Sequence, residues 1–426
     1  MRHFYNLLFN NFIANLGNNF IWFALTFWVY LETRSVMYTS FVAGIFMVCN
    51  LVFVFSFGKY VDNNKKKKVM IVSSILSFAF YILASLLYLA FDINNLNDYS
   101  SMAFWSFIIL LLLGTSFGNL RNIALPICVN LFFKEEDRAK GNGMIGAVGG
   151  AVFGLGSVLS GLAIGFLGMG YSLVILLVLN IFVFLHLFTV KIPESDILHL
   201  DKKENLNFKQ TLFFIIGVPG LLALIFFTTL NNFLGGVFMS LMDAYGLSLV
   251  SVQTWGTMWG LLSFVFIISG ISIAKFGVGK NPVRTMILLN IIVWFTCVFF
   301  AWYGSIVLFL IGVITWMFLS PFIESSENTI IQKVVPYENQ GKVTGFGQTL
   351  ESAATPFTAF MIGPLTELIF IPFMNNGWGA TYLSFLYGKG NMAGIGLVFS
   401  LAGIIGTLFS ILMLRTRAYK QLSKKF

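Results

Sequence analysis

The sequence predicts an all-α integral membrane protein with twelve transmembrane helices in two halves of six. Of its 426 residues, 58% are hydrophobic and only 10% are charged, which excludes a soluble domain of this length. Apolar runs of about twenty residues, long enough to cross a bilayer as a helix, recur from end to end. Turn residues and charges separate these runs. The expected spans are 8–31, 36–58, 69–91, 102–126, 143–167, 172–190, 218–241, 251–275, 284–303, 305–331, 344–371 and 393–415.

The basic residues indicate how these spans are oriented. Five lysines lie in the short segment 58–68 between the second and third spans, and lysines in short loops stay on the cytoplasmic side of a membrane. Of the other basic residues, only Arg34, Lys389 and Arg121 fall outside the termini and the loops on that side. We therefore expect both termini in the cytoplasm and the protein in the plasma membrane. The same distribution explains the net charge of +9 without a nucleic-acid partner.

The two halves repeat each other. The pattern Gly-x-x-x-Asp at 58–62 recurs as Gly-x-x-x-Ala at 270–274, an offset of 212, and segment 136–143 recurs at 338–345, an offset of 202. Such parallel repeats are typical of transporters built by duplication. A polar stretch with a proline separates the halves. The predicted organisation is an N-terminal half at 1–190, a cytoplasmic linker at 191–211 and a C-terminal half at 212–426.

Segment 58–68 resembles the loop signature of the major facilitator superfamily, which lies between the second and third helices. Consensus members carry Arg after the Asp and often Gly two positions further on, where this chain has Asn63 and Lys65. The resemblance implies a six-plus-six architecture that works by alternating access. It also implies that the loop is a cytoplasmic gate, with Asp62 facing the positive N-terminus of the eleventh helix. The gating residues implied in this way are Gly58, Asp62, Lys66 and Lys67, where the glycine permits a close helix approach.

Three shorter motifs resemble the macrolide-efflux branch of the drug-proton antiporters. They are Gly-Thr-Ser-Phe at 114–117, Leu-Asn-Asn-Phe at 230–233 and Gly-Pro-Leu-Thr-Glu at 363–367. The antiporter signature of the fifth helix is incomplete, because Ala151 stands where the family has proline and a paired glycine is missing. The glycines at 146, 150 and 154 have a spacing that allows close helix packing in any case. The resemblance favours export over import.

Four charged residues of the expected spans are candidates for a functional role, because a charge inside a membrane needs a partner, water or a function. Arg121 and Glu324 are at least nine residues, about 14 Å of helix, from the nearest cytoplasmic lysine. In the fold that the resemblance implies, the fourth and tenth helices line the cavity and face each other across it. The repeat offset of 202 aligns Arg121 with Ile323, the residue before Glu324. We expect Arg121 and Glu324 to approach and separate as a proton-coupling pair; the alternative is a permanent structural ion pair. Glu327 is nearer the interface, and Glu351 is either a second protonation site or tied to a gate.

Amides and tryptophans are the candidates for the wall of a substrate cavity. Amides inside a membrane point at water or at other helices, and tryptophans could contact an amphipathic guest. The alternatives are interhelical hydrogen bonding for the amides and lipid or core contacts for the aromatics. His186 in the sixth span is expected to be structural. The candidate cavity residues are Asn15, Asn18, Asn19, Trp22, Asn231, Asn232, Trp255, Trp259 and Trp316.

The energy source is expected to be an ion gradient. No phosphate-binding loop of an ATPase is present, and the glycine-rich segment 388–390 follows no strand. Cys49, Cys128 and Cys297 have neither disulfide nor metal spacing, so we expect no metal and no cofactor besides the proton gradient. The sequence therefore predicts a monomeric transporter, not an enzyme, whose partners are protons, membrane lipids and a lipophilic small molecule that it exports. The alternatives are a lysophospholipid or glycolipid translocator and a proton-coupled importer of a small solute.

Overall fold

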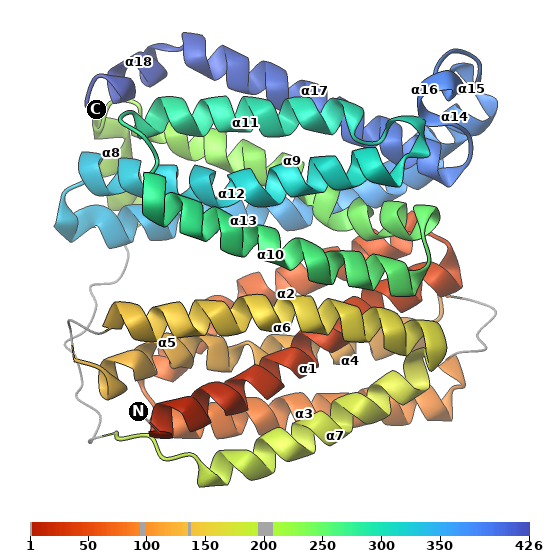
Figure 1. Cartoon of the computed structure of the whole chain (residues 1–426), viewed down its shortest axis with the longest axis vertical. Helices are drawn as coiled ribbons and strands as arrows, with labels where there is room; N and C mark the ends of the chain where they lie inside the picture. The colour runs from red at the N-terminus through yellow and green to blue at the C-terminus, as the bar shows by residue number, and fades with distance from the viewer. Residues whose placement is uncertain (1, 94–98, 135–137, 195–207) are drawn as a thin grey trace. The chain divides into compact units, whose positions relative to one another are not determined.

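The structure, a computed structural model, describes residues 2–93, 99–134, 138–194 and 208–426. Within these ranges the backbone forms helices and connecting turns without a strand (Figure 1). Twelve of the described helical segments are long and apolar enough to cross a membrane. The predicted fold class, all-α with twelve transmembrane helices, is therefore confirmed, and the protein is a multi-pass membrane protein.

The observed helices follow the expected spans closely. Those before the linker are α1 (Arg2–Thr33), α2 (Val36–Asp62), α3 (Lys66–Ala90), α4 (Met102–Gly118), α5 (Leu120–Phe132), α6 (Arg138–Phe166) and α7 (Gly168–Thr189). Those after it are α8 (Phe208–Gly217), α9 (Leu221–Leu249), α10 (Val252–Phe276), α11 (Pro282–Phe299), α12 (Ile306–Val334), α13 (Tyr337–Leu365), α14 (Ile371–Asn376), α15 (Trp378–Tyr382), α16 (Ser384–Tyr387), α17 (Asn391–Arg415) and α18 (Arg417–Ser423), with a 3₁₀ turn η3 (Trp302–Gly304) and a π-helical turn η4 (Thr366–Phe370).

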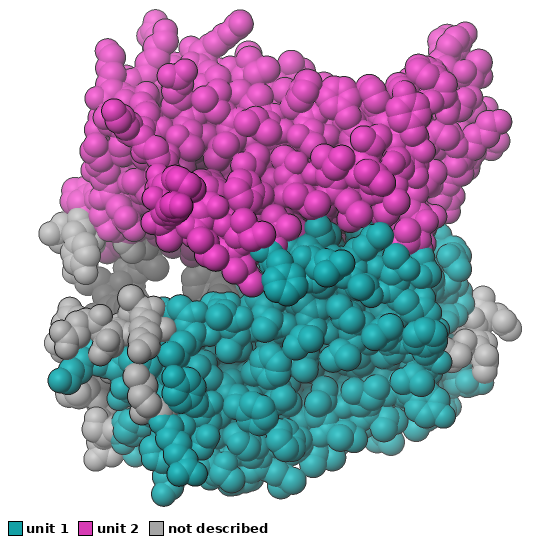
Figure 2. All heavy atoms as spheres, in the orientation of Figure 1, with its two compact units in different colours: residues 1–34, 45–202, 251–264 teal, residues 35–44, 203–250, 265–426 magenta. Residues whose placement is uncertain are grey.

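The chain divides into two compact units, shown in teal and magenta in Figure 2. The first third of α2 belongs to unit 2, and the first half of α10 belongs to unit 1. These two helices are related by the internal repeat, so the exchange is reciprocal. The units comprise 1–34, 45–202 and 251–264 (unit 1) and 35–44, 203–250 and 265–426 (unit 2).

In unit 1, α1 packs against both α6 and α7, and α3 packs against α4 and α7. The apolar core at the start of α1 joins it to the ends of α2 and α5 and to the start of α3, through Phe4, Val61, Val69 and Val129 among others. In unit 2, α11 lies beside α17 and α12, while α9 packs along α13 (Figure 1). These pairings position the charged side chains described below.

The fourth span contains a break that its apolar pattern does not predict. The helix stops at Gly118 and resumes at Leu120, with Asn119 forming a turn between α4 and α5. A side chain at Gly118 would overlap the amide of Asn18 on α1, so glycine is required for the close approach. Pro126 removes a further helical hydrogen bond inside α5. Arg121 therefore sits in the first turn of a new helix and not midway along an unbroken one.

Between the last two spans the chain is helical where the sequence indicated a loop. The eleventh span continues through η4 into α14, and α15 and α16 follow before α17 begins. Three aromatic side chains of α15 and α16, Trp378, Tyr382 and Phe385, are largely exposed. These helices are short and have no apolar period, which is why the sequence did not reveal them.

Candidate functional site: membrane-embedded charges and amides

A cluster of carboxyl groups lies in unit 2, where α9, α12 and α13 meet. The Thr228 hydroxyl on α9 donates a hydrogen bond of 2.6 Å to Oε1 of Glu351 on α13. Glu327 on α12 lies within hydrogen-bonding reach of both Glu351 and Thr228. Two carboxyl groups can share a hydrogen bond only when one of them carries a proton. The arrangement therefore suits a site that holds one proton between two carboxylates.

Glu324 is the third carboxylate of this cluster. It lies one turn before Glu327 on α12, close enough for its charge to interact with Glu351. Pro321, one turn earlier, cannot donate the helical hydrogen bond at its position, which loosens α12 next to the cluster. Glu324 is exposed, whereas Glu327 and Glu351 are half-buried. Among the described residues, none of the three carboxylates contacts a Lys or Arg.

Arg121 lies in the interior of unit 1 and is only 2% exposed. Its guanidinium donates hydrogen bonds to Asn10 Oδ1 at 3.2 Å and to Ser74 Oγ at 2.9 Å. Asn10 in turn donates to the Val183 carbonyl and bonds to Nδ1 of His186. Because the Asn10 oxygen accepts from a donor-only group, its nitrogen must be the donor to His186. The described contacts of Arg121 are thus to neutral groups of α1 and α3, and its pairing with Glu324 remains a prediction.

A row of asparagines crosses three helices of unit 1. Asn15 on α1 donates to Asn122 on α5 at 2.8 Å, Asn122 donates to Asn119 at 3.4 Å, and Asn119 donates to Asn50 on α2 at 3.1 Å. These side chains are exposed or half-buried. Amides with spare hydrogen-bonding groups within membrane spans need water or a polar ligand beside them. Of the four, the sequence singled out only Asn15.

The other predicted amides are engaged in packing to different degrees. Asn18 is buried and accepts a 2.9 Å hydrogen bond from the Tyr81 hydroxyl. Asn19 donates to the carbonyl of Asn15 in its own helix. In unit 2, Asn231 accepts from the indole of Trp294 at 2.6 Å. Asn232, which is exposed, donates to the Thr228 carbonyl.

The predicted tryptophans lie in separate places. Trp255 and Trp259, at the start of α10, contact each other edge to face in unit 1, and Trp255 has no exposed surface. Trp22 stacks on Phe46 at a centroid distance of 4.2 Å. Trp316 packs on Phe266 in unit 2. Trp255 is fully buried in this structure, and its place in the wall of a substrate cavity remains a prediction.

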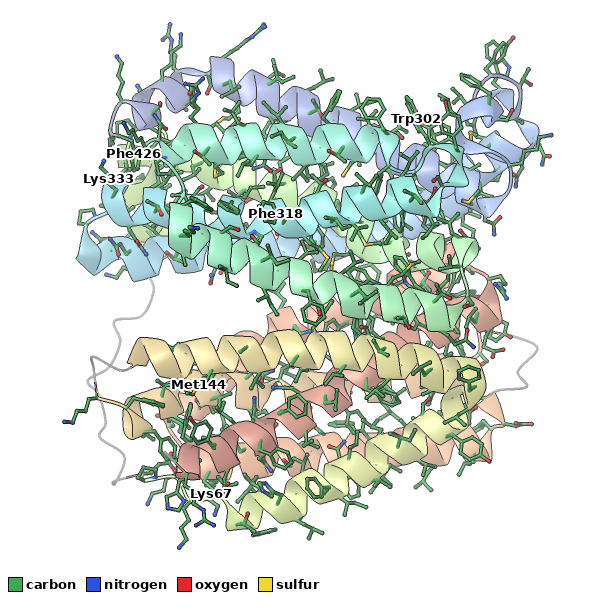
Figure 3. The ribbon with its side chains drawn as sticks, viewed as in Figure 1. Lys67, Met144, Trp302, Phe318, Lys333 and Phe426 are labelled. Atoms are coloured by element: carbon green, nitrogen blue, oxygen red, sulfur yellow. The ribbon has the colours of Figure 1, made fainter. Side chains whose placement is uncertain are left out.

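The loop between α2 and α3 is held by contacts within unit 1, and Figure 3 labels Lys67, which follows the loop at the start of α3. Lys67 Nζ donates to the Val190 carbonyl at 2.7 Å, Lys66 Nζ donates to the Val61 carbonyl at 2.6 Å, and both backbone amides donate to the carboxylate of Glu194. Glu194 therefore caps the N-terminus of α3. A Cβ at Gly58 would meet no described heavy atom within 4 Å, and the close helix approach expected there remains a prediction. The side chain of Asp62 lies outside the described part of the chain, and its gating role remains a prediction.

Sequence reasoning missed Thr228, Trp294, Glu194 and three asparagines of the row. Their partners come from distant parts of the sequence, so only the packing of the helices brings them together. Thr228 carried one signal, because it lies three residues before Asn231, on the same face of the expected helix.

Three solved structures of transporters share the fold of this chain. The structure superposes on a nucleoside transporter, NupG, with a TM-score of 0.73 at 11% identity, covering 98% of this chain and 100% of that one. It superposes on a bacterial homologue of the human lysosomal transporter Spinster with a TM-score of 0.68 at 12% identity, covering 100% and 97%. A D-xylose-proton symporter gives a TM-score of 0.64 at 13% identity, covering 95% and 97%. At these identities the similarity shows the transporter fold alone.

The family follows from the sequence comparison. The family model described as Major Facilitator Superfamily matches residues 7–359. The chain therefore belongs to the major facilitator superfamily, as segment 58–68 indicated. No curated protein sequence matches the chain.

Proposed function

We propose that this protein is a secondary active transporter that exports lipophilic or amphipathic compounds, such as macrolide-like drugs, in exchange for protons. It works as a monomer in the plasma membrane, by alternating access and with both termini cytoplasmic. The observation that carries the proposal is the contact of Glu327, Glu351 and Thr228, because a group that takes up and releases one proton is what an antiporter of this kind requires.

The proton would move in step with the helices. While Glu327 and Glu351 lie together, one proton and the Thr228 hydroxyl offset their mutual repulsion. When α12 and α13 shift, the contact opens and each carboxylate meets water separately, so the shared proton leaves. Glu324 and Arg121 would alter the charge balance in the course of the cycle. The asparagine row of unit 1 would supply hydrogen bonds to the polar groups of the exported compound.

The test uses inverted membrane vesicles that contain the full-length protein. Lipophilic cations, macrolides and a fluorescent lysophospholipid are offered with and without an imposed proton gradient. We expect uptake that depends on the gradient, and we expect Glu327→Gln and Glu351→Gln to lose it while still exchanging substrate down its own gradient. Glu32→Gln, which removes a carboxylate at the end of α1, is the matched control and should behave as wild type.

The outcomes separate the candidate functions. Transport of the lysophospholipid alone would identify a lipid translocator, and accumulation of a small polar solute in right-side-out vesicles would identify an importer. Undiminished proton-driven uptake in both Gln variants would remove the carboxyl pair from the mechanism.

A further inference from the structure

The motif at 363–367 has no role in the carboxyl cluster, yet its last residue makes a defined contact within unit 2. Glu367 follows α13 and lies in the π-helical turn η4. Its Oε2 accepts a 2.6 Å hydrogen bond from the Ser35 hydroxyl and a 2.9 Å hydrogen bond from the backbone N–H of Met37. Ser35 is the residue before α2, and its hydroxyl oxygen also accepts from the N–H of Tyr38. Glu367 and Ser35 together satisfy two first-turn donors of α2.

Helices α2 and α13 approach closely along the first third of α2. A side chain at Gly363 would overlap the Ser40 hydroxyl. One turn further along, the Phe360 ring packs against Gly44 and lies 5.8 Å from the ring of Phe41. These contacts repeat at helical spacing on one face of α2. They end at Gly44, where α2 leaves unit 2, so the rest of the helix belongs to unit 1.

The repeat provides an internal comparison. Helices α6 and α10 correspond to α13 and α2, and the first half of α10 packs on α6 within unit 1. There Gly161 meets the backbone of Val252 and Gly256, in the same way that Gly363 meets α2. At the offset of 202, however, the counterpart of Glu367 is Gly165, which faces the side chain of Gln253. The close packing is duplicated, but the carboxylate occurs at one junction only.

A carboxylate on the first turn of a helix opposes the positive end of the helix dipole and accepts charge-assisted hydrogen bonds. Unlike glycine packing, this interaction is directional and is lost completely when the helix end moves by a few ångströms. The first residues of α2 are therefore attached to α13 by an interaction that is either made or broken.

We propose that Glu367 is a latch that holds the amino-terminal end of α2 on α13, and that it releases once in each transport cycle to open that side of the protein. The proposal rests on the alternating access assumed in the proposed function. Glu367 acts as a positioning residue and contacts neither proton nor substrate.

The test measures the opening directly, by distances between two spin labels in the full-length protein in lipid nanodiscs. The three native cysteines are replaced, and labels are placed at Met102 and Lys389, which are exposed and lie on the α2 amino-terminal side by the alternation of the spans. Glu367→Ala should raise the ratio of the longer to the shorter distance by about tenfold or more, the size expected for loss of a charge-assisted hydrogen bond. Ser35→Ala should shift it in the same direction by less. Glu32→Gln, at the same end of the molecule, should leave the distribution unchanged.

A wild-type distance distribution in Glu367→Ala would overturn the latch. Should that variant fail to elute as a folded protein, Glu367→Gln and Ser35→Ala decide, because both keep the packing of α2 on α13. The measurement needs neither substrate nor proton gradient. If Glu367→Ala shifts the distances but the vesicles show no proton-driven export, only the proposed function is refuted. If the vesicles show proton-driven export but Glu367→Ala leaves the distances unchanged, only the latch is refuted.

Discussion

The interiors of the two units hold opposite charges in different ways. In unit 1, one guanidinium, that of Arg121, is fully buried and fixed by two neutral partners from neighbouring helices. In unit 2, Glu327 and Glu351 lie against each other, and both are only half-buried. A guanidinium keeps its charge under all physiological conditions, whereas a carboxyl pair can gain and lose a proton. The interior of unit 1 therefore carries a permanent positive charge, whereas the negative charge of the carboxyl pair in unit 2 changes with protonation.

The sharpest way to test this difference is to remove the fixed charge. Burying an arginine within a membrane costs about 2.5–3.5 kcal/mol on insertion scales, and two hydrogen bonds to neutral groups offset only part of that cost. We expect Arg121→Met, which keeps an unbranched apolar stem and removes the charge, to raise the melting temperature in detergent and to reduce proton-driven transport to background. Such a combination is typical of a residue retained for function at the expense of stability.

The control for this prediction is Asn10→Ala. It leaves the guanidinium buried with one partner fewer, so the melting temperature should fall. If Arg121→Met instead melts at a lower temperature and transports normally, the guanidinium is a structural element of α1, α3 and α5.

A smaller effect is expected for the most exposed carboxylate of the cluster on α12 and α13. Glu324 is exposed and interacts with Glu351 only through its charge. Glu324→Gln should therefore keep part of the proton-driven transport that Glu327→Gln loses, when both are measured as the accumulation ratio in vesicles at equal expression. Coupling identical to wild type would exclude Glu324 from the mechanism, and a loss as complete as that of Glu327→Gln would place it inside the proton site.

The sequence was sufficient for the spans but not for the contacts inside the site. Apolar runs and lysine positions depend on local composition, so all twelve spans could be predicted. Which face of a helix meets which neighbour depends on packing across hundreds of residues. The asparagines of α1 illustrate this limit: Asn18 is buried against Tyr81, whereas Asn15 joins an exposed row with Asn122. Both have the same residue type and nearly the same position in the pattern.

The charged residues show the same limit. Because charge inside a membrane is costly, the sequence alone identified four charged residues within the spans as candidate functional residues: Arg121, Glu324, Glu327 and Glu351. The repeat offset suggested a partner for Arg121 but could not reveal that Asn10 and Ser74 hold it. Likewise, nothing in the composition indicates that Glu327 and Glu351 meet, since they lie on different helices joined by a turn.

The smallest expected effect concerns the neutral member of the carboxyl site. Thr228 donates one hydrogen bond to Glu351, and a hydrogen bond to a charged group contributes about 1.5–3 kcal/mol when fully buried. Because Glu351 is only half-buried, we expect about 1 kcal/mol at this position, roughly a fivefold change in an equilibrium constant. Thr228→Val should lower the proton-driven accumulation ratio by about that factor, and Thr228→Ser, which keeps the hydroxyl, should restore it. A loss in Thr228→Ser together with wild-type accumulation in Thr228→Val would show that the methyl group of Thr228 matters and its hydroxyl does not, since Val keeps the methyl packing of α9 on α13 and removes only the hydrogen bond to Glu351.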